Sequence, residues 1–76
     1  EALGNKKWVA KNYANIGNLY TAQGNYALAL EYLLKALKLN EESGEVSSII
    51  NNYSNIGIIY TDQGKYSEAL KFQLSL

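Results

Sequence analysis

The apolar positions near the start of the chain follow the period of a helix. Between residues 5 and 23 they recur at intervals of three and four, which is the spacing along one helix face. This side carries Val9, Tyr13, Ile16, Gly17 and Tyr20. The opposite side carries Lys11, Asn15, Asn18 and Ala22. The pattern therefore predicts an amphipathic helix over about residues 5–23.

The following segment has a wider apolar arc. After a short turn at Gly24 and Asn25, a second helix is expected over about residues 26–43. A turn this short makes the two helices antiparallel neighbours. A helix with a wide apolar arc is expected to be buried on two sides, against the first helix and against the next one. The arc consists of Tyr26, Ala29, Leu30, Leu33, Leu34, Ala36 and Leu37.

The whole pattern returns forty residues later. Residues 12–26 and 52–66 carry the same amino acid at ten of fifteen positions. Self-similarity at a fixed period is the signature of a repeat protein. The third and fourth helices are therefore expected over about residues 45–63 and 65–76, the last one shorter than its counterpart.

These helices divide the chain into two copies of one unit, residues 5–44 and 45–76. Gly44 follows the second helix, and a glycine there is a common helix stop because it tolerates the left-handed conformation. Since Gly4 aligns with Gly44, residues 1–4 are interpreted as the tail of a preceding repeat. The chain is accordingly expected to be part of a longer array.

The recurring residues resemble the tetratricopeptide repeat pattern, in which Trp or Tyr, Leu-Gly, Tyr, Gly-x-Tyr and Ala follow at fixed spacing. The first copy has Tyr13, Ile16, Gly17, Tyr20, Gly24, Tyr26 and Ala29, and the second has Tyr53, Ile56, Gly57, Tyr60, Gly64, Tyr66 and Ala69. The usual period is about 34 residues, so a period of forty is similar to the long-helix variant of this family. The resemblance implies an all-α, right-handed helical-repeat solenoid of two helix-turn-helix units with four antiparallel helices.

Two glycines lie inside the first helices of the units. Glycine costs about 1 kcal/mol in a helix interior, so the recurrence of Gly17 as Gly57 indicates a close helix crossing at both positions. One departure from the repeat pattern is Gln73, which stands where the first copy has Leu33.

Composition narrows the possible functions. The net charge is zero, and the seven basic residues are all lysine, which argues against a nucleic-acid partner because arginine and clustered positive charge supply most of that affinity. The chain has no histidine and no cysteine, so ordinary zinc ligation and histidine-based acid–base chemistry are excluded. We therefore expect no catalytic residues, no metal, no cofactor and no enzymatic activity.

Hydropathy and cysteine content indicate where in the cell the protein is expected. No apolar run approaches the 18 or so residues of a membrane span, so no membrane association is expected. The absence of cysteine fits a cytoplasmic location.

The asparagines are the feature of the sequence that indicates a binding role in addition to a structural one. The resemblance implies that the first helices line a concave groove, and a side-chain amide both donates and accepts hydrogen bonds. The groove residues predicted to bind a peptide are Lys11, Asn15, Asn18, Asn51, Asn55, Ile58 and Asp62. Ala14 and Ser54 stand where relatives that clamp a chaperone C-terminus carry lysine, so that ligand is not expected. The alternative is that these amides are solvated or hold neighbouring helices in register.

Two functions of different classes remain open. The first is a protein-interaction module whose groove binds an extended peptide or a helix of a protein partner. The second is a structural repeat element that stacks head-to-tail without a dedicated ligand. Both repeat ends carry apolar residues, Leu3, Trp8 and Leu19 at one and Phe72, Leu74 and Leu76 at the other. A homo-oligomer formed by end-to-end stacking, or by helix exchange through residues 40–44, is therefore expected.

Overall fold

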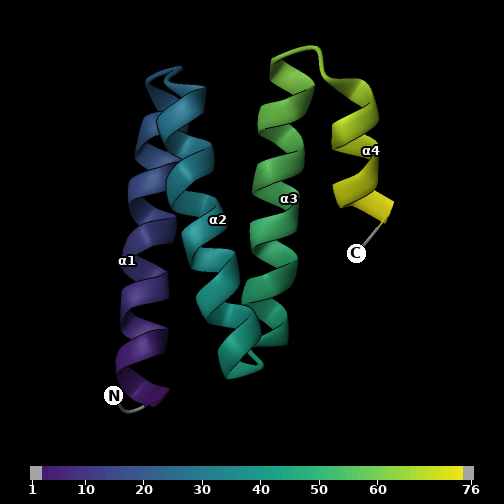
Figure 1. Ribbon diagram of the computed structural model, residues 1–76. Coiled ribbons are helices and arrows are strands. Elements are labelled where there is room, and N and C mark those ends of the chain that lie inside the picture. The colour runs from purple at the N-terminus through teal and green to yellow at the C-terminus, as the bar shows by residue number, and fades with distance from the viewer. Residues whose placement is uncertain (1–2, 75–76) are drawn as a thin grey trace.

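The described part of the chain consists of helices joined by short turns. The computed structural model describes residues 3–74. They form α1 Leu3–Ala22, α2 Tyr26–Ser43, α3 Val46–Asp62 and α4 Tyr66–Leu74. Figure 1 shows the four helices in chain order, each antiparallel to the one before. The expected all-α fold of two helix-turn-helix units is confirmed.

The helix boundaries differ from the expectation mainly at the N-terminus. α1 begins at Leu3, two residues before the expected start, so Leu3 and Gly4 lie in the same helix as the residues that follow them. The assignment of residues 1–4 to a preceding repeat stays a prediction. Glycine adopts the right-handed helical region as readily as the left-handed one, so its alignment with a helix stop does not by itself end a helix. The other ends within the described range lie within one residue of the expected positions. Residues 1–2 and 75–76 lie outside the described residues.

The turns within the two units share one geometry. Gly24 and Gly64 have φ values of 78° and 76°, which favour glycine because a Cβ would be strained there. The backbone N–H of the residue after each glycine donates to the carbonyl of Tyr20 at 2.9 Å and of Tyr60 at 2.8 Å. Gly44, at φ 69°, ends α2 in the same left-handed conformation. Gly44 is thus the helix stop that the sequence predicts.

The core is centred on α2. Leu33, on this helix, is fully buried together with Ile56 and Ile59 of α3. Leu33 also lies against Gly17 of α1. The helix therefore packs against both of its neighbours, as its wide apolar arc predicts.

The two interior glycines lie in different surroundings. A Cβ added at Gly17 would lie 2.7 Å from Cγ of Leu33 and 3.2 Å from the carbonyl oxygen of Ala29. A Cβ added at Gly57 would lie 3.4 Å from Cγ of Gln73, an ordinary contact. The expectation of a close crossing is confirmed at Gly17 and is wrong at Gly57, because the flexible side chain of Gln73 replaces the buried Leu33.

Tyrosines pack between the two helices of each unit. In the first unit, the ring of Tyr32 stacks on Tyr20 with centroids 5.8 Å apart. In the second unit, Phe72 stacks on Tyr60 at 5.7 Å. The matched pairs confirm that these aromatic residues are packing residues.

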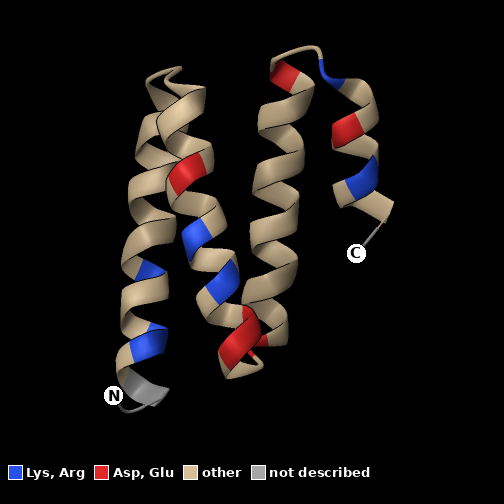
Figure 2. Ribbon diagram, viewed as in Figure 1, with Lys and Arg blue, Asp and Glu red and all other residues tan. Residues whose placement is uncertain are grey.

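Charged residues gather at the end where α1 approaches the α2–α3 connection (Figure 2). Lys6 Nζ lies 3.2 Å from Glu42 Oε1, and Lys7 Nζ lies 3.7 Å from Glu45 Oε1. These ion pairs are partly exposed, so each contributes little to stability. Across residues 3–74, no helix is both long and apolar enough to cross a membrane.

Candidate peptide-binding groove

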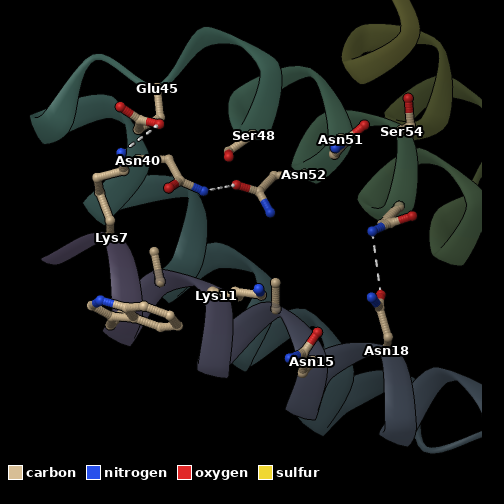
Figure 3. Close-up of a pocket in the computed structure, with 14 residues that line it drawn as sticks. Lys7, Lys11, Asn15, Asn18, Asn40, Glu45, Ser48, Asn51, Asn52 and Ser54 are labelled. Carbon is tan, nitrogen blue, oxygen red and sulfur yellow. Dashed lines mark hydrogen bonds and ion pairs between the residues drawn. The ribbon is translucent and has the colours of Figure 1, made fainter. Parts of the chain in front are cut away.

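A groove of about 640 Å³ lies between the first helices of the two units. Its walls come from α1 and α3, and Asn40 of α2 lies at its floor (Figure 3). The neutral polar lining consists of Asn15, Asn18, Asn40, Asn51, Asn52, Asn55, Ser48 and Ser54. The rest of the lining comprises Lys7, Trp8, Ala10, Lys11, Ala14 and Glu45. Most of the polar surface is thus amide or hydroxyl, groups that both donate and accept hydrogen bonds.

The structure brings five of the seven predicted groove residues together and leaves two outside. The five that line the groove are Lys11, Asn15, Asn18, Asn51 and Asn55. Ile58 and Asp62 lie nearer the C-terminal end of α3, beyond the last lining residues. Asp62 instead accepts a hydrogen bond from the hydroxyl of Tyr26 at 3.4 Å. These two residues therefore do not line this groove, and a role for them in binding a peptide stays a prediction.

A hydrogen bond joins the two walls at the last lining residues of α1 and α3. Asn55 Nδ2 donates to Asn18 Oδ1 at 3.2 Å, from α3 to α1. No lining residue lies beyond this pair on either helix. Two predicted groove amides therefore link neighbouring helices, which is the alternative role that the sequence left open for the asparagines.

A second amide pair is buried at the floor of the groove. Asn40 Nδ2 donates to Asn52 Oδ1 at 2.7 Å. Only 5% of Asn40 and 3% of Asn52 is exposed. A short, buried hydrogen bond between two side chains fixes the orientation of both amides.

The sequence pattern does not predict the pairing of Asn40 with Asn52. Asn40 lies near the predicted end of the second helix, and Asn52 is not among the predicted groove residues. A usable signal was present, since both asparagines fall within helical segments, where Asn is a mediocre helix former. Their juxtaposition depends on how α2 crosses α3, and the period of a single helix does not contain that information.

Lys11 is the groove cation without an acidic partner in the described structure. Its Nζ lies 5.6 Å from the ring centroid of Trp8. The other groove lysine, Lys7, pairs with Glu45. The groove therefore presents one positive charge that no carboxylate within residues 3–74 neutralises.

The sequence of the chain matches a known protein family. A family model described as tetratricopeptide repeat matches residues 8–74. The chain belongs to the tetratricopeptide repeat family. Neither the curated proteins nor the solved structures include a significant match. Tetratricopeptide repeats are generally protein–protein interaction modules and are typically non-catalytic.

Equivalent positions of the two tetratricopeptide repeats differ in burial. Ile16 is 38% exposed but its counterpart Ile56 is fully buried, and Leu19 is 59% exposed but its counterpart Ile59 is fully buried. In the second repeat these positions pack against Leu33 of the first repeat. No described helix covers the same side of α1. A shallow hollow of about 290 Å³ lies there, lined by Asn15, Ile16, Leu19, Tyr20 and Gln23.

Acidic residues do not gather into a metal-binding constellation in the part of the chain described. No group of three or more His, Cys, Asp or Glu side chains within it could hold a metal ion.

Proposed function

We propose that the groove between α1 and α3 binds an extended peptide segment of a partner protein. The observation that carries the proposal is the concentration of amide side chains along one open groove. An extended peptide has unpaired backbone N–H and C=O groups, and each needs a hydrogen-bonding partner when it leaves water. Asparagine side chains supply both kinds of partner without reading the peptide's side chains.

An extended segment fits this lining better than a helix does. A helix satisfies its own backbone hydrogen bonds, so it would bury the groove amides without giving them backbone partners. The α1 lining runs from Lys7 to Asn18, about 17 Å at 1.5 Å per residue. This length accommodates about five residues of extended peptide.

The charge of Lys11 gives the groove a preference among peptides. Lys11 lies in the groove without a carboxylate partner in the described structure, and the groove amides are neutral. A peptide with an acidic group near Lys11 and Trp8 would supply the missing charge. We infer that such peptides bind more tightly than neutral ones, and that the preference weakens with added salt.

Composition supports the same class of partner. The chain has zero net charge and no arginine, which favours a protein partner over a nucleic acid. With no cysteine in the sequence, a cytoplasmic location remains our proposal.

Selection of peptides from a random decapeptide library by the wild-type chain tests the proposed function, with affinities then measured by calorimetry. Asn15 and Asn51 are exposed groove residues without hydrogen bonds of their own in the described structure. The double variant Asn15→Ala/Asn51→Ala should lose roughly tenfold in affinity, as two modest hydrogen bonds imply. Asn12→Ala is the matched control, because Asn12 is an exposed asparagine of α1 outside the groove lining. Failure to enrich any peptide, or equal affinities of the double variant and the control, would overturn the proposal.

A second candidate function is self-assembly through the repeat ends. It is favoured by the exposure of Ile16 and Leu19 at positions that are buried in the second repeat. A second copy could cover this surface with its α4, where Leu70 and Leu74 are exposed. Such a contact is head-to-tail, so it would form rings or open stacks. Exchange of helices through residues 40–44 is the competing route to a dimer.

A further inference from the structure

The buried amide pair at the floor of the groove has unused hydrogen-bonding capacity. Asn40 uses its Nδ2 group and Asn52 uses its Oδ1 atom in the bond between them. Asn52 Nδ2 has no partner among the described residues. Figure 3 shows Asn52 with its oxygen toward Asn40 and its nitrogen directed into the groove.

The surroundings of Asn52 fix this orientation. The oxygen and the nitrogen of a side-chain amide lie in one plane, on opposite sides of the Cβ–Cγ bond, so directing Oδ1 at Asn40 directs Nδ2 away from it. Asn40 comes from the first unit and Asn52 from the second, so the packing of the two units holds both ends of the bond. The orientation is therefore set before any ligand arrives.

Asn52 Nδ2 is open to the groove. The buried side-chain atoms that lack any partner in the described structure are Ser43 Oγ and Gln63 Oε1, and Asn52 Nδ2 is not one of them. Because Asn52 lines the groove, the remaining surface of this nitrogen faces the groove space. A nearly buried donor with an opening on one side is suited to an acceptor that enters from that side.

The equivalent asparagine of the first repeat has no such arrangement. Asn12 occupies the position of Asn52 one repeat earlier, but it is exposed and does not line the groove. No described residue holds its side chain as Asn40 holds Asn52. The oriented donor is thus a product of the junction between the two repeats.

We propose that Asn52, oriented by Asn40, is the groove's fixed donor and binds a main-chain carbonyl oxygen of the bound peptide. This inference rests on the proposed function and names the residue that sets the peptide's register. An extended peptide directs carbonyl oxygens to each side in alternation, so one fixed donor selects which carbonyls can face the floor. Asn40 is a positioning residue, because it acts through Asn52.

The decisive variant is Asn52→Asp, measured against a peptide that the wild-type chain selects from the random decapeptide library. Aspartate has nearly the shape of asparagine and keeps one oxygen to accept from Asn40. Its second oxygen replaces the donor and repels a carbonyl oxygen. We expect the affinity to fall by roughly tenfold or more. The control Asn12→Asp makes the same charge change on α1 outside the groove lining and should leave the affinity unchanged.

Backbone substitution in the peptide identifies the partner atom. Replacing single amide bonds of the selected peptide by esters weakens one carbonyl acceptor at a time. At one position the ester should weaken binding to the wild-type chain yet cause little further loss in Asn52→Asp, because the two changes remove the same hydrogen bond. Ester effects that are equal in both proteins at every position would overturn the assignment to a carbonyl oxygen.

A measurement on the wild-type chain covers the case in which Asn52→Asp does not fold. The side-chain Nδ2 protons of Asn52 should shift downfield in NMR spectra when the selected peptide binds, and the Asn12 side-chain signals should not move. Unchanged Asn52 signals at saturation, or wild-type affinity in a folded Asn52→Asp, would overturn this inference and leave the proposed function intact. Failure of the wild-type chain to select any peptide would overturn both.

Discussion

Leu33 of α2 lies directly against the backbone of Gly17 on α1. A Cβ added at Gly17 would come within 2.7 Å of Cγ of Leu33. Leu33 is fully buried, so it has no room to retreat. At the equivalent crossing in the second repeat, the neighbour of Gly57 is Gln73, and the same distance is 3.4 Å. The two repeats therefore differ in how tightly their helices cross.

The substitutions Gly17→Ala and Gly57→Ala should have different effects on stability. Gly17→Ala forces a methyl group into Leu33 and should lower the free energy of unfolding by about 1–3 kcal/mol. Gly57→Ala meets only an ordinary contact and should leave stability unchanged or raise it by up to about 1 kcal/mol, since alanine favours the helix. Urea denaturation of both variants measures the difference. Equal losses in the two variants would show that both crossings are tight.

Variants of the Asn40–Asn52 pair should affect the free energy of unfolding and the peptide affinity differently. Asn40→Ala leaves Asn52 buried with an unpaired oxygen and should cost about 1–3 kcal/mol of unfolding free energy. Replacing both residues by leucine removes the unpaired groups and keeps similar shapes, so the double variant should recover most of that loss. It should still bind the selected peptide weakly, because the donor is absent. Thermal melts and calorimetry on the same three proteins test this, and full binding by the double leucine variant would contradict it.

The hydrogen bond between Asn55 and Asn18 should contribute modestly to stability. The bond is 3.2 Å long and exposed, so Asn55→Ala should lower the unfolding free energy by about 1 kcal/mol or less. A double-mutant cycle with Asn18→Ala isolates the interaction, because each single variant removes the same bond. Zero coupling would mean that the pair does not link α1 to α3 in solution.

Self-association should depend on the exposed side of α1. Ile16→Lys/Leu19→Lys places charges on a surface that no described helix covers, so it should prevent concentration-dependent association and leave the melting temperature of the monomer nearly unchanged. Ile56→Lys/Ile59→Lys makes the same changes at buried positions and should unfold the chain, because unpaired buried charges are costly. Light scattering across a wide concentration range, with circular dichroism, checks both. A wild-type chain that stays monomeric at millimolar concentration would exclude assembly.

The helices and turns could be predicted because their causes are local. The apolar period, Gly24 and Gly44 determine the structure of residues that are close to them in the sequence. The forty-residue repeat supplies the apolar period and the turn glycine a second time. The exposed stripe of α1 also follows from the helix period, and Asn15 and Asn18 of this stripe both line the groove. These predictions needed no knowledge of packing between units.

The remaining features depend on contacts between helices far apart in the sequence. Asn40 and Asn52 meet because α2 crosses α3. On α3 the last residue that lines the groove is Asn55, which bonds to Asn18 of α1, so Ile58 and Asp62 do not line it. The helix crossing at Gly57 is less tight because Gln73 stands where the first repeat has Leu33. The substitution is visible in the sequence, but its effect on the crossing is seen only in the structure.

Chemical-shift mapping of the uniformly ¹⁵N-labelled chain with a library-selected peptide tests the central claim most directly. Groove binding predicts saturable shifts in the side-chain amides of Asn15, Asn51 and Asn52, with little change at Ile16 and Leu19 on the outer side of α1. Shifts confined to Ile16 and Leu19, or the absence of any saturable shift, would contradict the claim that the groove between α1 and α3 is the binding site.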